Sequence, residues 1–204
     1  MDWITTLQAA KIQSLWTCLH DGDLLTAYLD APAQTLRFNI RVGHLLGGSD
    51  LDPTVEFILT IHGLKVNHSA RLFPPFAFEE PQNVTREERH RKVEQHLQLW
   101  RSQSISWEDL IEDLKVGPLD IMEASLVKSD GLIGLALGGN LTSSRDSGSY
   151  CYVYVAGSTL QVERSDGNPF SLDNLVQLGD RYWEEFSLRA QQRRGHSAPT
   201  TQAP

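Results

Sequence analysis

The sequence predicts an α+β protein with about eight antiparallel strands arranged in two meanders. Apolar and polar side chains alternate along 35–42, 54–61 and 65–72, as they do on strands with one buried and one solvated face. A second group of such segments follows a charged stretch that carries helix-capping residues. We therefore expect a single domain over 1–190, with an N-terminal helix, a central helical insert near 85–114 and a C-terminal helix.

The first strand group follows a predicted helix over 5–19, where apolar residues recur at helical spacing. Its four strands are expected at 23–30, 35–42, 54–61 and 65–72. A glycine-containing loop that ends in proline separates the second strand from the third. His62-Gly63 lies between the third and fourth strands, and this pair predicts either a hairpin turn or a bulge at Gly63.

Helix-start signals mark the insert between the two strand groups. Thr85 and Glu88 have the spacing of a capping box, in which each side chain satisfies a free amide of the first turn. The helix that begins there is expected to run to about Ser102. Ser106 then caps a second short helix over 107–114.

The second strand group is expected at 119–128, 132–137, 150–155 and 159–164. Asp130-Gly131 is a strong turn signal between its first two strands. Ser171 caps the last helix, which has a broad apolar face. From Gln191 onward the sequence is rich in Gln, Arg, Ser, Pro and Thr, and we expect a disordered tail over 191–204.

Composition narrows the functional classes. The chain of 204 residues is 40% hydrophobic and 22% charged, with a net charge of −8, so a basic footprint for nucleic acid is missing. It has neither a membrane-spanning apolar run nor a secretory start, and we expect a cytoplasmic protein without membrane contact. Cys18 and Cys151 stand in unrelated contexts and are expected to be buried thiols.

No catalytic, cofactor or metal motif is present in the sequence, so we expect no catalytic residue and no cofactor. The one compact cluster of ligand-type residues is His20, Asp21 and Asp23. Such a group can bind a metal or act as an acid–base pair. A helix end followed by a turn requires the same residue types for structural reasons, and this is the simpler interpretation.

Two charged surfaces are candidates for contact with a partner. Arg37, Arg41 and Arg71 are expected to project from the polar face of the first strand group, although ion pairs on a solvated sheet would also explain them. The short helix after Ser106 carries four acidic residues, Glu108, Asp109, Glu112 and Asp113. Such a helix can bind a cationic partner or simply be solvated.

Tyr150, Tyr152 and Tyr154 form a row on one face of their strand. An exposed row of tyrosines can be a recognition surface, because each ring offers a large contact area and a hydroxyl at low entropy cost. Packing beneath a helix is the simpler interpretation. The glycines at 134, 138 and 139 are expected to serve packing and a turn rather than phosphate binding.

Leu19-His20-Asp21-Gly22 follows a helix and precedes a strand, and this arrangement resembles a broad group of small uncharacterised bacterial proteins. Some members of that group are regarded as immunity proteins that neutralise toxins. The resemblance covers about ten residues. It implies a protein-binding role and carries no catalytic residue over.

These observations favour a non-enzymatic bacterial binding protein, such as a toxin-neutralising or other protein-interaction module. Its partner is expected to be another protein, bound through surface complementarity. The alternative is a small-molecule-binding domain or hydrolase with a pocket between sheet and helices. A buried cavity lined by convergent polar groups favours this alternative, whereas a flat exposed patch favours the first interpretation.

Overall fold

The computed structural model describes residues 11–43, 56–73, 84–97, 101–141 and 150–196. The strands of the first part of the chain are β1 (Lys11–Ser14), β2 (Gly22–Asp30), β3 (Thr35–Arg41), β4 (Glu56–His62), β5 (Val66–Phe73) and β6 (Arg101–Ser104). The later strands are β7 (Leu119–Ser129), β8 (Leu132–Leu141), β9 (Tyr150–Gly157), β10 (Thr159–Arg164) and β11 (Pro169–Phe170). The helices are α2 (Trp16–Leu19), α3 (Arg86–Leu97), α4 (Trp107–Val116) and α5 (Leu172–His196). The fold is therefore α+β with a large antiparallel sheet, as predicted.

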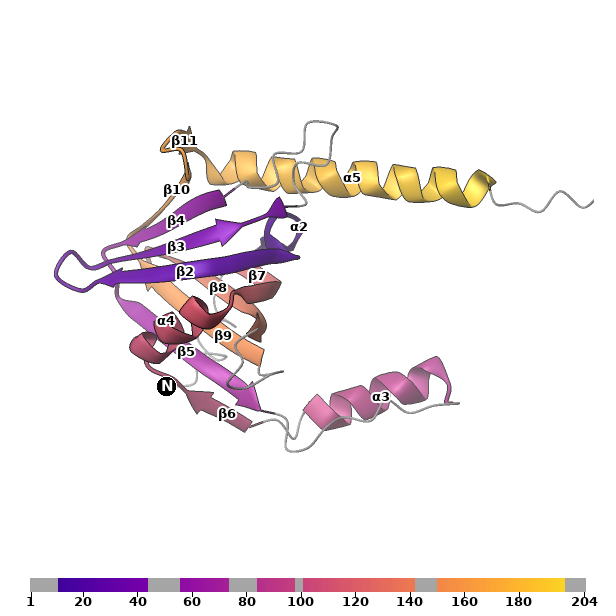
Figure 1. Cartoon of the computed structure of the whole chain (residues 1–204), viewed down its shortest axis with the longest axis horizontal. Coiled ribbons are helices and arrows are strands. Elements are labelled where there is room, and N and C mark those ends of the chain that lie inside the picture. Colours follow the sequence, from indigo (N-terminus) through magenta and orange to yellow (C-terminus); the bar gives the residue numbers. More distant parts are fainter. Residues whose placement is uncertain (1–10, 44–55, 74–83, 98–100, 142–149, 197–204) are drawn as a thin grey trace, which may run out of the picture.

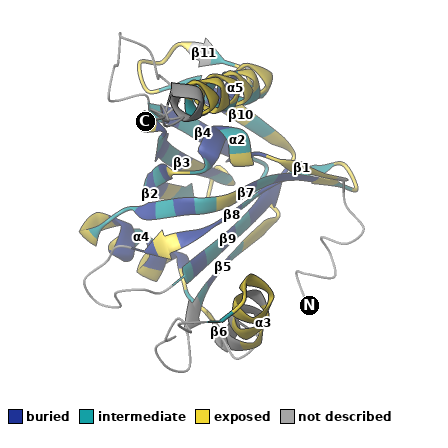
Figure 2. Ribbon diagram, turned by 90° about the vertical axis from the view of Figure 1, so that its right-hand side faces the viewer, coloured by how far each residue is buried: buried dark blue, intermediate teal, exposed yellow. Residues whose placement is uncertain are grey.

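The strands form one continuous antiparallel sheet in the order β11-β10-β4-β3-β2-β7-β8-β9-β5-β6, and β1 pairs with β7 beside this path. The sheet doubles back on itself, so that β2, β3 and β4 lie in front of β7, β8, β9 and β5 (Figure 1). The apolar core fills the space between the two layers, with fully buried residues such as Phe38, Leu59, Leu137 and Val153. Figure 2 shows the buried residues on the strands and the most exposed ones on α3 and α5.

The predicted pairing of the two meanders is wrong at the fourth strand of each group. β5 does not form a hairpin with β4 at His62-Gly63 but crosses to the other layer and pairs with β9. Likewise β10 leaves β9 and pairs with β4. The two crossings meet where the amide of Ser158 donates to the carbonyl of His62 over 2.8 Å. Gly157 lies against the His62 and Gly63 backbone at this point, where a Cβ would collide.

Because of this exchange, the molecule has two halves with the same strand connectivity and pairing. We call β2, β3, β4 and β10 with β11 the first half, and β7, β8, β9 and β5 with β6 the second half. Each half has a β-bulge at the same place, between Leu24 and Thr26 in β2 and between Ile121 and Glu123 in β7. The halves join where Asp23 pairs with Asp120. A residue in one half therefore has a counterpart at the same register position in the other.

Two helices close the edges of the sandwich. Ser106 caps α4, since its hydroxyl accepts a hydrogen bond from the Asp109 amide over 3.1 Å, and Ser171 accepts one from the Asn174 amide over 3.0 Å at the start of α5. Leu110 of α4 and Leu175 of α5 are both fully buried. The capping box of α3 also forms, because the Glu88 amide donates to Thr85 Oγ1 over 3.2 Å.

Several element boundaries differ from the prediction. Lys11–Ser14 is a strand rather than part of an N-terminal helix, because it pairs with the stretch of β7 that β2 leaves free. The predicted end of the helix near 102 is wrong, since α3 ends at Leu97 and Arg101–Ser104 pairs with β5. α5 continues to His196, so 191–196 is helical, as good helix formers such as Gln and Arg allow.

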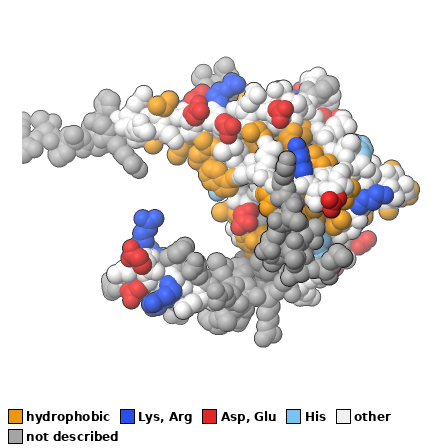
Figure 3. All heavy atoms as spheres, turned by 180° about the vertical axis from the view of Figure 1, so that it is seen from behind, with side chains coloured by type: hydrophobic (Ala, Val, Ile, Leu, Met, Phe, Trp, Pro, Cys, Tyr) orange, Lys and Arg blue, Asp and Glu red, His pale blue; other side chains and the backbone are white. Residues whose placement is uncertain are grey.

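Seen from behind (Figure 3), α3 and α5 project from the same side of the body, and hydrophobic side chains gather beneath α5. The aromatic residues of α5 pack on α2, where Trp183 stacks on Trp16 at 4.8 Å between ring centroids. Trp183 Nε1 also donates to the carbonyl of Thr17 over 3.0 Å. Within the described residues, no helix has the length and apolar character needed to cross a membrane.

Candidate functional site

The predicted cluster of His20, Asp21 and Asp23 is not a single site. His20 Nδ1 lies 2.7 Å from Asp21 Oδ1, and the His20 ring packs edge-on against Trp16 at 4.5 Å. Asp23 belongs instead to β2, where its Oδ2 lies 2.8 Å from an Arg41 guanidinium nitrogen. Asp21 adopts a left-handed backbone conformation with φ of 60°, so the segment is a turn between α2 and β2.

The predicted basic surface is divided between the two halves. Arg37 and Arg41 do share the outer face of the first half, but each forms an ion pair, Arg37 with Glu163 at 3.3 Å and Arg41 with Asp23. Arg71 lies on β5 in the second half, and its side chain is 12% exposed. It pairs with Asp113, which is buried in α4. Arg71 and Asp113 thus hold α4 against the sheet and are not available to a partner.

The remaining acidic residues of α4 are solvated. Glu108, Asp109 and Glu112 are exposed. Asp109 accepts a hydrogen bond from the capping Ser106 hydroxyl over 2.8 Å, and Glu112 pairs with Lys115. These residues therefore form the solvated side of a capped helix.

A different surface lies on the outer face of the second half. Its centre is a line of small residues on β8, Gly134, Ala136 and Gly138, which we call the β8 trough. The register places Tyr152 beside Gly138 and Tyr154 beside Ala136 on one side. On the other side Glu123 lies beside Gly138 and Val127 beside Gly134.

The tyrosine rings lie across the glycines of the trough. A Cβ added to Gly138 would lie 2.8 Å from Tyr152 Cε1 and 2.9 Å from the Tyr150 hydroxyl. A Cβ on Gly134 would lie 3.1 Å from Tyr154 Cε2. The glycines therefore admit the rings, as aromatic residues often cover glycines on neighbouring strands. Tyr150, Tyr152 and Tyr154 are each half-buried, and in the described part of the chain the main contacts of α4 are with β2 and those of α2 with α5 and β7.

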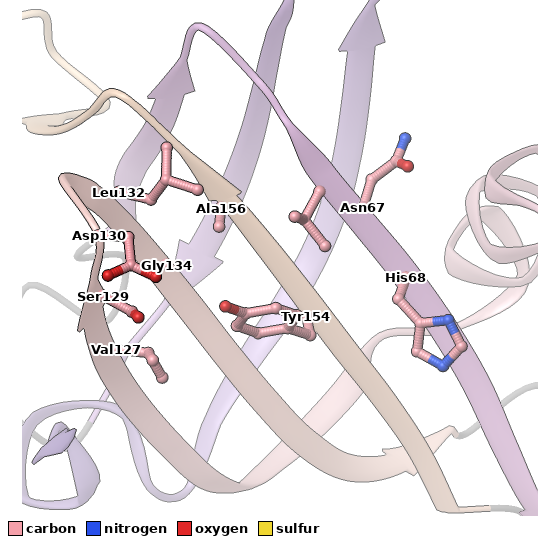
Figure 4. A pocket seen from close by; sticks show the side chains of 10 residues that line it. Asn67, His68, Val127, Ser129, Asp130, Leu132, Gly134, Tyr154 and Ala156 are labelled. Atoms are coloured by element: carbon pink, nitrogen blue, oxygen red, sulfur yellow. The ribbon is translucent and has the colours of Figure 1, made fainter. Parts of the chain in front are cut away.

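Two adjoining hollows open on this face, with volumes of about 370 and 180 Å³, and Val127 lines both. In the larger hollow the Tyr154 ring lies across the sheet between β9 and β8, while His68 lies on the neighbouring strand β5 (Figure 4). Exposed apolar side chains flank the hollows: Val66 is 38% exposed and Ile12 is 56% exposed. The face thus combines aromatic rings, small residues and open apolar surface.

The tyrosine hydroxyls are coupled to a carboxylate. Burial is the largest cause that raises the pKa of Tyr150 above its ordinary value of 10.0, and the Glu123 charge and Tyr152 add to it. Burial and Glu123 also raise the pKa of Tyr152, and burial raises that of Tyr154. The rings of Tyr150 and Tyr152 lie 5.0 Å apart. All three hydroxyls are therefore neutral hydrogen-bonding groups over the physiological pH range.

Metal binding and the cysteine thiols can be assessed for the described residues. No three His, Cys, Asp or Glu side chains among them come together in a way that could hold a metal. Cys18 and Cys151 are buried free thiols, as predicted, and burial raises the pKa of each to about 12. A thiol with such a pKa is a poor nucleophile near neutral pH.

The sequence contained part of the signal for this face. Alternation in the sequence predicts the tyrosine row, whereas the sequence assigns its glycine partners only to packing and a turn. What shows that Tyr152 and Gly138 lie side by side is the strand register, which a single sequence does not specify. Comparison with family models, with curated proteins and with solved structures finds no match to this chain.

Proposed function

We propose that the protein is a non-enzymatic binding protein that holds a segment of another protein along the β8 trough. The observation that carries the proposal is the combination of half-buried tyrosines with a floor of glycine and alanine on an open sheet face. Tyrosine is favoured in protein interfaces because it contributes apolar contact and a hydroxyl from one rigid ring. Neutralisation of a toxin, as the sequence resemblance implied, would be one use of such a surface.

The shape of the site favours an extended segment over an enclosed molecule. The two hollows adjoin along β7 and β8 rather than forming one closed chamber. Small-molecule sites usually enclose most of the ligand surface. The larger hollow does have a volume of about 370 Å³, within the range of small-ligand pockets. Binding of a compact metabolite is therefore the second candidate function, and a thermal-shift screen distinguishes it.

Selection from a library of short random peptides on phage tests the proposal. Peptides enriched on the wild-type protein are measured by fluorescence anisotropy against wild type, Ala136→Gln and Arg37→Gln. Ala136 and Arg37 are counterparts in the two halves, so both variants place glutamine at the same register position. The long side chain fills the trough in Ala136→Gln, which should weaken binding by about tenfold or more.

Arg37→Gln is the matched control and should bind these peptides like wild type. Circular dichroism and urea unfolding establish that both variants are folded. If no peptide is enriched, or if the enriched peptides bind Ala136→Gln as tightly as wild type, the proposed function is wrong. A thermal shift with a single metabolite that Ala136→Gln abolishes would favour the second candidate.

A further inference from the structure

The two halves differ in how they balance charge on their outer faces. In the first half, Asp23 is neutralised by Arg41 at 2.8 Å and Glu163 by Arg37 at 3.3 Å. The residue that follows the bulge, Thr26, pairs with Asn39, so Arg37 and Arg41 stand two positions before and after Asn39 on β3. Both of these carboxylates are therefore paired with an arginine of β3.

The second half keeps carboxylates but lacks these arginines. Glu123 follows the bulge and pairs with Gly138, so the counterparts of Arg37 and Arg41 are Ala136 and Asn140. Asp120, the counterpart of Asp23, pairs in register with Asn140. Among the described residues, no ion pair is found for Asp120 or Glu123.

Among the described residues, those that line the two hollows of the β8 trough have histidine as their only basic side chain. The residues that line its two hollows include Glu123 and Asp130 and contain no lysine or arginine. The chain as a whole carries a net charge of −8, which attracts positively charged partners over distance. The electrostatic field at this face therefore favours a cation.

The aromatic rings add a second attraction for the same kind of group. Guanidinium and ammonium groups bind over the faces of tyrosine rings, and more strongly where water is partly excluded. Tyr152 and Tyr154 point to the same side of β9 and are two residues apart, which is roughly 6.6 Å along a strand. An extended segment repeats its side chains on one face at the same spacing.

We propose that the segment bound in the β8 trough is cationic, with arginine or lysine at every second position, so that its charges lie over Tyr152 and Tyr154 and pair with Asp120 and Glu123. This inference rests on the proposed function and specifies the chemistry of the partner. The partner thus supplies the basic groups that the first half contributes from its own Arg37 and Arg41.

Three synthetic peptides of equal length test the inference, in which valine alternates with arginine, glutamine or glutamate. Their affinities are measured by fluorescence anisotropy at low and high salt. The arginine peptide should bind about tenfold more tightly than the glutamine peptide, and its advantage should shrink at high salt. The glutamate peptide should bind the most weakly.

The double variant Asp120→Asn with Glu123→Gln should remove most of the advantage of the arginine peptide, and Glu163→Gln on the first half should leave it unchanged. Ala136→Gln, which adds no charge, should weaken both the arginine and the glutamine peptide. Equal binding of the arginine and glutamine peptides would overturn the cationic partner and leave the proposed function standing. Failure of all three peptides would overturn the cationic partner. It would overturn the proposed function as well if the phage library yields no peptide sensitive to Ala136→Gln.

Discussion

On the outer face of the first half, charged side chains pair with one another, whereas the outer face of the second half carries tyrosine rings and two hollows. On the first half, Asn39 donates to Glu56 over 3.1 Å, and Arg37 and Arg41 form ion pairs across strands. At the counterparts of Asn39 and Arg37, the second half has Gly138 and Ala136. The same strand order thus carries paired charges in one half and the proposed binding surface in the other, depending on a few residues of the second strand of each half.

The inner sides of the halves also differ, and this gives the largest expected effect. Arg71 on β5 and Arg164 on β10 are counterparts, but only Arg71 forms a buried pair, with Asp113. Arg71→Ala leaves Asp113 as an unpaired buried charge and should lower the unfolding free energy by about 3–5 kcal/mol. Arg164→Ala should lower it by less than about 1 kcal/mol. Urea unfolding measures both, and equal losses would show that the Arg71 pair has no special role.

A smaller effect is expected where the tyrosines cover glycine. Gly138→Ala places a Cβ within 2.8 Å of Tyr152 Cε1, so we expect a loss of about 1–3 kcal/mol from overpacking together with a changed near-ultraviolet circular dichroism spectrum. Asn39→Ala at the counterpart removes one hydrogen bond, worth about 1 kcal/mol, and should leave the tyrosine spectrum as it is. An unchanged spectrum in Gly138→Ala would mean that the rings do not rest on the glycine.

Alkaline pH should weaken the second half through its tyrosines. The folded-state pKa values of Tyr150, Tyr152 and Tyr154 are raised above the ordinary value of 10.0, so the folded protein holds their protons more tightly than the unfolded chain does. Their contribution to stability is therefore complete below pH 10 and declines as the pH rises further. Urea unfolding over this pH range measures the decline.

Glu123→Gln tests the coupling between the Glu123 carboxylate and the Tyr150 hydroxyl. Its charge is the second largest cause of the raised pKa of Tyr150, after burial. The variant should lower the pKa of Tyr150, measured by ¹³C NMR of the tyrosine rings. If the Tyr150 signal titrates identically in wild type and Glu123→Gln, the carboxylate is not coupled to this hydroxyl.

The smallest effect belongs to the ion pairs of the first half. Arg37 and Glu163 are partly exposed at 49% and 24%, and such pairs contribute about 0.2–1 kcal/mol. A double-mutant cycle with Arg37→Gln and Glu163→Gln should give a coupling energy within that range, and it should fall with added salt. A coupling of several kcal/mol would contradict the view that this face is merely solvated.

Local chemistry was sufficient to predict many elements from the sequence. The caps at Thr85, Ser106 and Ser171 depend on residues three positions away, and all three form. Alternating polarity also identified the face of each main strand that is buried, as Phe38 and Leu59 illustrate. These signals lie within a few residues of one another, which is why a single sequence reveals them.

Non-local pairing was not predictable in the same way. A turn at Gly63 or Gly157 can lead either to a hairpin or to a crossing into the other layer. Which of the two forms depends on the strand that β5 or β10 pairs with after the turn. The same limit hid the partnership of Arg71 with Asp113, which lie on different elements. It also hid the β8 trough, because the meaning of Gly138 depends on the strand beside it.

Partners are expected to bind the second half and not the first. Amide and tyrosine-ring NMR spectra of the labelled protein, recorded with and without the tightest peptide from the library, test it most directly. The shifts should concentrate on Tyr152, Tyr154 and the residues of β7 and β8, with β3 and β4 unchanged. Shifts that concentrate on β3 and β4 around Arg37 and Arg41 would contradict it.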